Sequence, residues 1–149
     1  MRRTILVADS DSRTAKLLRA TLEPRGFAVV EAPDAVSILT LLLWIPVGLV
    51  VVTPRQLGSR RLNPTAFRLL GFLRRRASFA RLPVVMFADG VPTADDQRML
   101  GRCGVEVVLK LEGVAQLATR IRVLTAGYEP SVVSQRDARF MPSVMMPTR

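Results

Sequence analysis

Several short apolar runs of this chain end in residues that could take part in chemistry. These residues are Asp9, Ser10 and Asp11 after the first run, Thr53 after the third, Asp89 after the fourth and Lys110 after the fifth. Clustered carboxylates can hold a hard cation, whereas a threonine hydroxyl is a weak nucleophile unless a base activates it. The chain has no histidine, which removes the commonest general base and every Ser-His-Asp triad. We find no nucleophile–base pair and no glycine-rich phosphate loop, so we do not expect an enzyme.

The elements that would position these residues alternate along the chain. Apolar runs at 4–8, 27–31, 48–52, 83–88 and 105–109 predict five strands. Helical stripes, with their start and stop signals, predict helices over 12–23, 33–44, 64–79, 93–102 and 113–125. This alternation predicts an α/β fold with a doubly wound, five-stranded parallel sheet and helices on both faces. In such a sheet the functional crevice lies at the carboxyl ends of the strands.

The chain is predicted to form one domain over residues 1–125, followed by a flexible tail or docking peptide over 126–149. The tail is rich in Pro, Ser and Arg and shows no clear period. A stretch without charge runs from Ala35 to Pro54 and is close to the length of a membrane span. Because Pro46 and Gly48 divide it into a helix-like half and a strand-like half, we expect no membrane span.

The chain is strongly basic, with 22 Lys and Arg against 12 Asp and Glu and a net charge of +10. This balance favours acidic partners: a protein face, nucleic acid or anionic lipid. The bias toward arginine also fits a GC-rich genome, in which case the charge carries no function. The single cysteine, Cys103, excludes an internal disulfide and suits a reducing cytoplasm.

Three stretches of the chain resemble response-regulator receiver domains, the CheY-like family. ILVADSDS resembles the opening of these domains, LPVVMFAD their fourth strand and GVEVVLK their fifth, and the likeness covers roughly residues 3 to 125. The resemblance implies a flavodoxin-like (βα)5 fold. In the family, two acids after the first strand and an aspartate after the third hold Mg²⁺, and that aspartate accepts a phosphoryl group. A Thr or Ser after the fourth strand and a Lys after the fifth then contact the phosphate.

The chain departs from this pattern at the metal ligands and at the phosphoacceptor. Asp9 matches the first acid, but Ser10 stands where the second acid should be. The carboxylate of Asp11 is offset by one residue and could substitute only in part. Thr53 stands at the phosphoacceptor, where its hydroxyl carries no charge for a metal and has no base to activate it.

The two positions that would contact the phosphate are also altered. Ala88 stands at the Thr/Ser position. An alignment without gaps places Leu111 at the lysine position, and Lys110 aligns with that position only if a one-residue gap is introduced. These losses predict a degenerate receiver, or pseudo-receiver, with no metal and no cofactor. Asp9 and Asp11 would then cap the first helix, with residual metal binding as the alternative.

An arginine belt lies between Asp34 and Asp89, a stretch that contains no acidic residue. It comprises Arg55, Arg60, Arg61, Arg68, Arg74, Arg75, Arg76 and Arg81. Three roles are open for this belt: a solvated face, a site for an acidic protein, or a site for nucleic acid or lipid phosphate. The belt lacks aromatics for base stacking and the chain has no helix-turn-helix or zinc module, so nucleic acid is the less favoured partner.

The second predicted helix ends in five consecutive apolar residues, from Leu41 to Ile45. A helix with a period of 3.6 residues cannot hide all five, so some should face solvent or a partner. Trp44 is a residue type enriched in interfaces. The alternative is that these side chains pack in the core beneath the tail.

We therefore predict a non-enzymatic, phosphorylation-independent module that binds a protein partner in bacterial signal transduction. The candidate partner-binding residues are Leu43, Trp44, Arg60, Arg61, Arg74, Arg75 and Arg76. The partner would be a signalling or regulatory protein, and a homodimer is a further alternative. The rival hypotheses are an atypical receiver phosphorylated on Asp9 or Asp11, a basic nucleic-acid-binding regulator and a small α/β enzyme.

Overall fold

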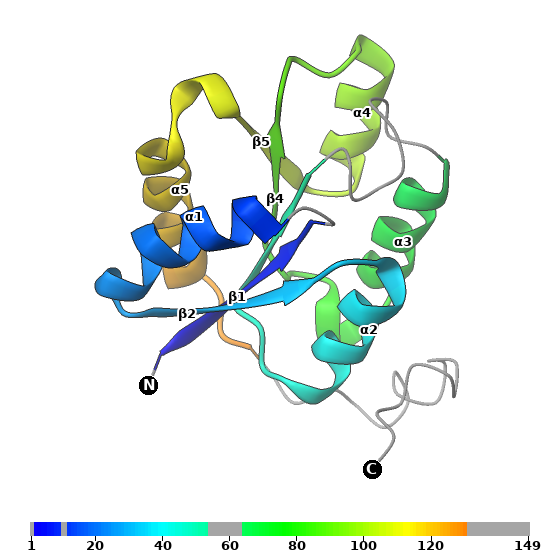
Figure 1. Ribbon diagram of the computed structural model, residues 1–149. Helices are drawn as coiled ribbons and strands as arrows, with labels where there is room; N and C mark the ends of the chain where they lie inside the picture. The colour runs from blue at the N-terminus through cyan, green and yellow to red at the C-terminus, as the bar shows by residue number, and fades with distance from the viewer. Residues whose placement is uncertain (1, 10–11, 54–63, 131–149) are drawn as a thin grey trace.

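A computed structural model of the chain describes residues 2–9, 12–53 and 64–130, with the side chains of 64–68 left out of that description. Five parallel strands form one sheet in the order β2-β1-β3-β4-β5. The strands are β1 (Arg3–Ala8), β2 (Phe27–Ala32), β3 (Leu49–Val52), β4 (Val84–Ala88) and β5 (Val105–Leu109). The predicted doubly wound five-stranded parallel sheet is confirmed (Figure 1).

Five α-helices alternate with the strands, as the sequence pattern predicted. They are α1 (Ser12–Leu22), α2 (Ala35–Trp44), α3 (Pro64–Arg74), α4 (Ala94–Arg102) and α5 (Val114–Ala126). Within the described residues, three short 3₁₀ turns join helices to strands: η1 (Glu23–Arg25), η2 (Ala77–Phe79) and η3 (Lys110–Glu112). Among the described ranges, no helix is both long and apolar enough to cross a bilayer.

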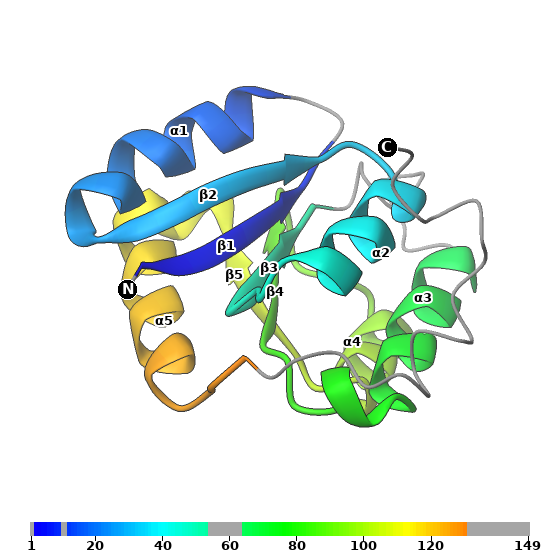
Figure 2. The same cartoon turned by 90° about the horizontal axis from the view of Figure 1, so that it is seen from below.

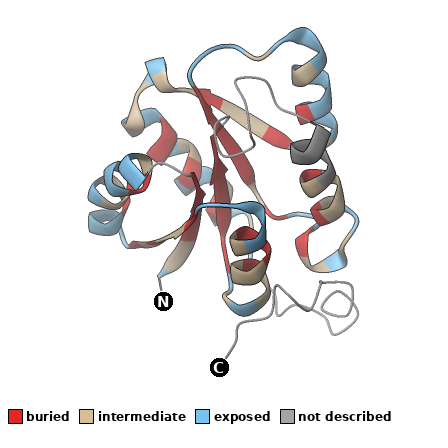
Figure 3. Ribbon diagram, turned by 45° about the vertical axis from the view of Figure 1, so that its right-hand side comes forward, coloured by how far each residue is buried: buried red, intermediate tan, exposed pale blue. Residues whose placement is uncertain are grey.

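The sheet is covered on both faces, which is why its strands are apolar throughout rather than alternating. Successive side chains of β1 enter different cores: Ile5 and Val7 pack with α1 and α5, whereas Leu6 and Ala8 pack with α2, α3 and α4. Figure 2 shows α1 and α5 on one side of the sheet and the other three helices on the opposite side. Burial is greatest in the central strands, and exposed residues gather on the outer faces of the helices (Figure 3).

Two helices begin at side-chain caps. The Asp34 carboxylate accepts a hydrogen bond from the backbone N–H of Ser37 at 2.7 Å, and this bond lowers the pKa of the Asp34 carboxyl. The Thr93 hydroxyl accepts in the same way from the N–H of Asp96, at 3.2 Å. Both caps satisfy backbone donors that the first helical turn leaves unpaired.

The end predicted for the third helix was wrong. The helix predicted over 64–79 ends at Arg74, because Arg76 adopts an extended backbone conformation and the chain then turns again in η2. Phe79 lies in this separate turn and is buried. In the sequence it therefore resembled one more apolar residue on the buried face of the helix.

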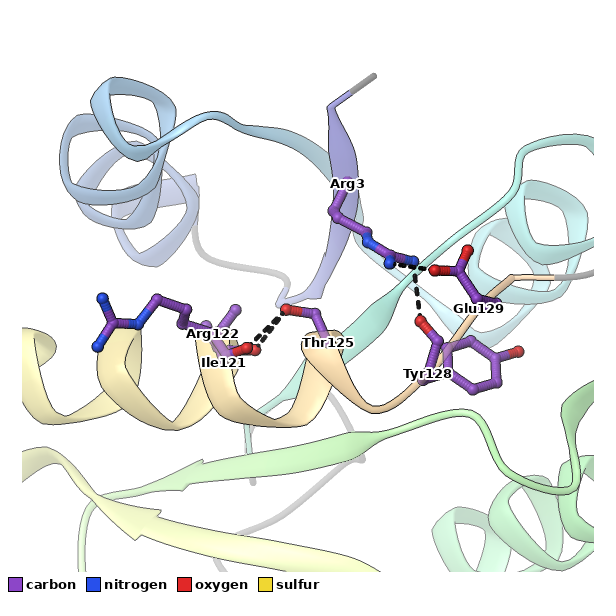
Figure 4. Close-up of polar contacts among 6 residues, drawn as sticks. All are labelled: Arg3, Ile121, Arg122, Thr125, Tyr128 and Glu129. Atoms are coloured by element: carbon purple, nitrogen blue, oxygen red, sulfur yellow. Dashed lines mark hydrogen bonds and ion pairs between the residues drawn. The ribbon is translucent and has the colours of Figure 1, made fainter.

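The segment after α5 is held against the start of β1. Arg3 donates through Nη1 to the carbonyl of Tyr128 at 2.8 Å, and its Nη2 lies 2.6 Å from Glu129 Oε1. Figure 4 shows the Arg3 side chain extending from β1 toward both residues. In the last turn of α5, the Thr125 hydroxyl donates to the carbonyl of Ile121 at 2.8 Å (Figure 4). Of the tail predicted over 126–149, the structure describes residues 126–130, and the rest lies outside the described residues.

Candidate functional site

The carboxyl edge of the sheet brings together the residues that the sequence placed after its apolar runs. Ala8 of β1 is paired with Val52 of β3, so Asp9 and Thr53 follow neighbouring strands at the same level. Ala88 of β4 is paired with Leu109 of β5 in the same way, which brings Lys110 to this edge. Ser10 and Asp11 lie outside the described residues.

Thr53 is the most enclosed polar residue of this edge. Its relative exposure is 1%, and its hydroxyl has no hydrogen-bonding partner among the residues that the structure describes. A buried neutral hydroxyl without a base has neither the charge to hold a metal nor the activation to attack a phosphoryl donor. The hydroxyl is also costly to bury unpaired, by about 1–3 kcal/mol.

Asp9 is also buried, with 7% of its surface exposed. A Mg²⁺ site needs several oxygen ligands around one point. In the described part of the chain, no three His, Cys, Asp or Glu side chains lie close enough together to hold a metal ion. The described residues of this edge therefore do not fit the metal site that the family resemblance implies.

Lys110 is the first residue of η3 and turns toward the end of β4. Its Nζ lies 3.1 Å from Asp89 Oδ1 and 5.9 Å from the centre of the Phe87 ring. The alignment without gaps had put Leu111 at the lysine position, but Leu111 is 93% exposed. Among the described residues, Lys110 is therefore a cation that reaches this edge, and it has a carboxylate partner there.

At Ala88, the fourth position of the site, the side chain is buried and apolar. It belongs to the core beneath α2, α3 and α4 and offers no hydroxyl to a phosphate. The edge thus presents one buried carboxylate, one buried hydroxyl and one paired ammonium from its described residues.

The apolar end of α2 divides between core and surface. Leu42 is buried, and Leu41, Leu43 and Ile45 are half-buried against the core. Trp44 is 57% exposed. The expectation that this run cannot be hidden completely is confirmed for Trp44, whereas Leu43 contributes largely to packing.

Of the arginine belt, Arg60 and Arg61 lie outside the described residues, and the other three candidate residues differ in their contacts. Arg75 is exposed. The Arg76 guanidinium lies over the Phe72 ring, 4.6 Å from its centre. The Arg74 guanidinium donates to four backbone carbonyls at 2.6 to 3.4 Å, which belong to Phe79, Ala80, Leu82 and Cys103.

The role of Arg74 as a partner-binding residue stays a prediction, and the structure adds a role within the fold. Its Nε and Nη1 are used to join α3 to the chain before β4 and β5. Burial lowers the pKa of its guanidinium, which still remains charged at neutral pH. The sequence could not predict this role because the acceptors are backbone carbonyls, which every residue type carries.

Comparisons with known proteins support the fold. No family model matches the chain, and no curated protein matches it. A response regulator from Thermotoga maritima is 20% identical, with a TM-score of 0.71 over 85% of this chain and 99% of that one. An orphan response regulator of H. pylori is 16% identical, with a TM-score of 0.68 over 84% and 99%.

A third solved structure is a pilus assembly-related protein from Burkholderia pseudomallei, which is 16% identical. Its TM-score is 0.67 over 87% of this chain and 94% of that one. Likeness at this level of identity shows a common fold without showing a common activity. The chain has the fold of response-regulator receiver domains.

Proposed function

We propose that the chain is a pseudo-receiver, which acts by binding a protein partner in bacterial signal transduction and does not accept a phosphoryl group. The observation that carries this proposal is the buried Thr53 hydroxyl at the position of the phosphoacceptor. Phosphoryl transfer in the family needs a metal-bound carboxylate there. An uncharged hydroxyl, closed off from solvent and without a base, cannot take that role.

The Lys110–Asp89 pair supports the same proposal. An ammonium that contacts a phosphate must be free to reach it, and Lys110 is paired 3.1 Å from Asp89 Oδ1. Both groups are partly exposed, so the pair is weak and contributes about 0–1 kcal/mol. The Asp89 carboxylate nevertheless neutralises the Lys110 ammonium without a bound phosphoryl group.

The partner surface that we propose combines an aromatic anchor with cations. Trp44 supplies exposed apolar area on α2, and Arg75 and Arg76 follow α3. Arg60 and Arg61 remain candidates from the sequence, and Arg74 is left out because its Nε and Nη1 donate to backbone carbonyls of the fold. A cationic surface with an aromatic residue suits a protein partner that carries acidic and apolar side chains.

The phosphorylation test is an intact-mass measurement after incubation with acetyl phosphate and Mg²⁺, beside an active receiver domain as positive control. We expect no phosphoryl adduct on this chain. A stoichiometric adduct that disappears in Asp9→Asn or Asp11→Asn would overturn the proposal and restore an atypical phosphorylated receiver.

The partner test is capture from a lysate of the source cell with matched variants of the immobilised chain. Trp44→Ala and Arg75→Gln should each reduce recovery of the same protein. Leu17→Ala and Arg25→Gln remove an exposed apolar side chain and an exposed charge elsewhere and should leave recovery unchanged. Equal losses in all four variants, or salt-steep retention of DNA in place of a protein, would contradict a specific protein-binding surface.

A further inference from the structure

A second concave site lies at the amino ends of β4 and β5, at the opposite edge of the sheet from Thr53. Its cavity of about 660 Å³ is within the size range of small-molecule sites. The walls come from the chain before β4, the end of α4 and the end of α5. Three of the lining residues are arginines and none is acidic, so the cavity has an uncompensated positive charge within its walls.

Arg74 is held rigidly in this cavity. Its Nε and Nη1 donate to the four carbonyls described above, which fixes the plane of the guanidinium. Its Nη2 donates to no described residue and lies beside Gly104, where an added Cβ would be 3.8 Å away. An arginine oriented in this way presents N–H donors to a ligand without losing side-chain entropy on binding.

Arg81 and Arg102 supply two further cations at the cavity. Both are exposed, and neither forms an ion pair or hydrogen bond with any residue in the described ranges. Arginine forks match the oxygens of a phosphate group, and such charge-assisted bonds are stronger than neutral ones. Three cations around one cavity therefore fit a ligand with more than one phosphate.

The rest of the wall is apolar and includes an aromatic ring. Leu82, Val123 and Tyr128 contribute to it, and Tyr128 is half-buried, with its pKa raised by burial. A phosphate alone would leave this surface without a contact. A ligand with a planar or apolar group attached to its phosphates would cover it.

We propose that this cavity binds a nucleoside polyphosphate, with the phosphates on Arg74, Arg81 and Arg102 and the base against the wall that contains Tyr128. This site goes beyond the partner binding proposed above and does not depend on it. It lies at the opposite edge of the sheet from Thr53 and shares no lining residue with that edge.

Calorimetric titration of the full chain with ATP and GTP at fixed salt tests the proposal. We expect saturable binding of at least one nucleotide, and a rise in Kd on the order of tenfold for Arg81→Gln and for Arg102→Gln. Arg25→Gln removes the same charge from η1, outside the cavity, and should change Kd by less than about twofold. Tripolyphosphate and the free nucleosides should each bind at least about tenfold more weakly than the nucleotide.

Three results would overturn the site. The first is the absence of saturable nucleotide binding. The second is an equal rise in Kd for the Arg25 variant and the two cavity variants, which would indicate general charge attraction. Tripolyphosphate that binds as tightly as ATP or GTP would remove the role of the apolar wall. Thermal melts of each variant without ligand verify that the folded state is intact. We expect unchanged melting temperatures, because Arg81 and Arg102 form no hydrogen bond or ion pair with the described residues.

Discussion

The guanidinium of Arg74 donates from Nε to the backbone carbonyl of Cys103 at 2.7 Å, across 29 positions of the chain. This bond ties the end of α3 to the turn that leads into β5. The same side chain donates from Nη1 to the carbonyl of Leu82 at 2.6 Å, just before β4. One arginine therefore connects three segments that no disulfide or metal joins in the described residues.

Replacing Arg74 should destabilise the fold. We expect Arg74→Met to lower the free energy of unfolding by about 2–3 kcal/mol, because partly buried carbonyls lose a charged donor. The measurement is urea denaturation followed by circular dichroism. Arg75→Met is the matched control, since Arg75 is exposed, and it should change stability by less than about 0.5 kcal/mol. Similar values for the two variants would contradict the role given to Arg74.

Replacing Thr53 with valine should stabilise the chain. Valine has nearly the shape of threonine and removes the unpaired buried hydroxyl, so we expect a gain of about 1 kcal/mol in the free energy of unfolding. Thr125→Val is the control, because that buried hydroxyl donates to the carbonyl of Ile121 and its loss should bring no gain. Destabilisation by Thr53→Val would show that the hydroxyl has a partner in the folded chain.

The cap of α2 predicts a dependence on pH. The pKa of Asp34 is lower in the folded chain than its ordinary value, so its contribution to stability is present above the unfolded pKa and is lost as the pH falls through the folded pKa. Asp34→Ala should lower the free energy of unfolding by about 1 kcal/mol at neutral pH, and this difference should shrink below about pH 4. Thr93→Ala removes the cap of α4, which does not titrate, and its effect should not follow this pH dependence.

The contacts of Arg3 predict a local change in dynamics. Arg3→Leu removes the donor to the Tyr128 carbonyl and the ion pair with Glu129. We expect faster amide hydrogen exchange at residues 127–130 with little change in the core strands, because the segment after α5 loses its attachment to β1. Arg122→Leu, an exposed change within α5 itself, should leave exchange at 127–130 unchanged. Equal exchange in both variants would mean that other contacts hold this segment.

Much of the fold could be predicted from the sequence because burial on both faces requires strands that are apolar throughout. The runs around Ile5, Val50 and Val85 are of this kind, and each of the three residues lies in the core. Parallel strands need crossover helices, so alternation along the chain was enough to predict the sheet. The edge that gathers Asp9, Thr53 and Lys110 followed from the same rule, since parallel strands all end on one side.

Other features depended on contacts between distant segments. Arg74 and Arg75 are adjacent and chemically identical, yet one is bound to four carbonyls and the other is exposed. Residue type alone cannot separate them, because a backbone acceptor has no sequence signature. The cavity lined by Arg81, Arg102 and Tyr128 likewise arises only when α4, α5 and the start of β4 meet. The sequence by itself determined the strands, their shared edge and the threonine that follows the third strand, since these depend on local residue type and period. Only the tertiary structure decided which cations are engaged within the fold, because that depends on which carbonyls folding brings within their reach.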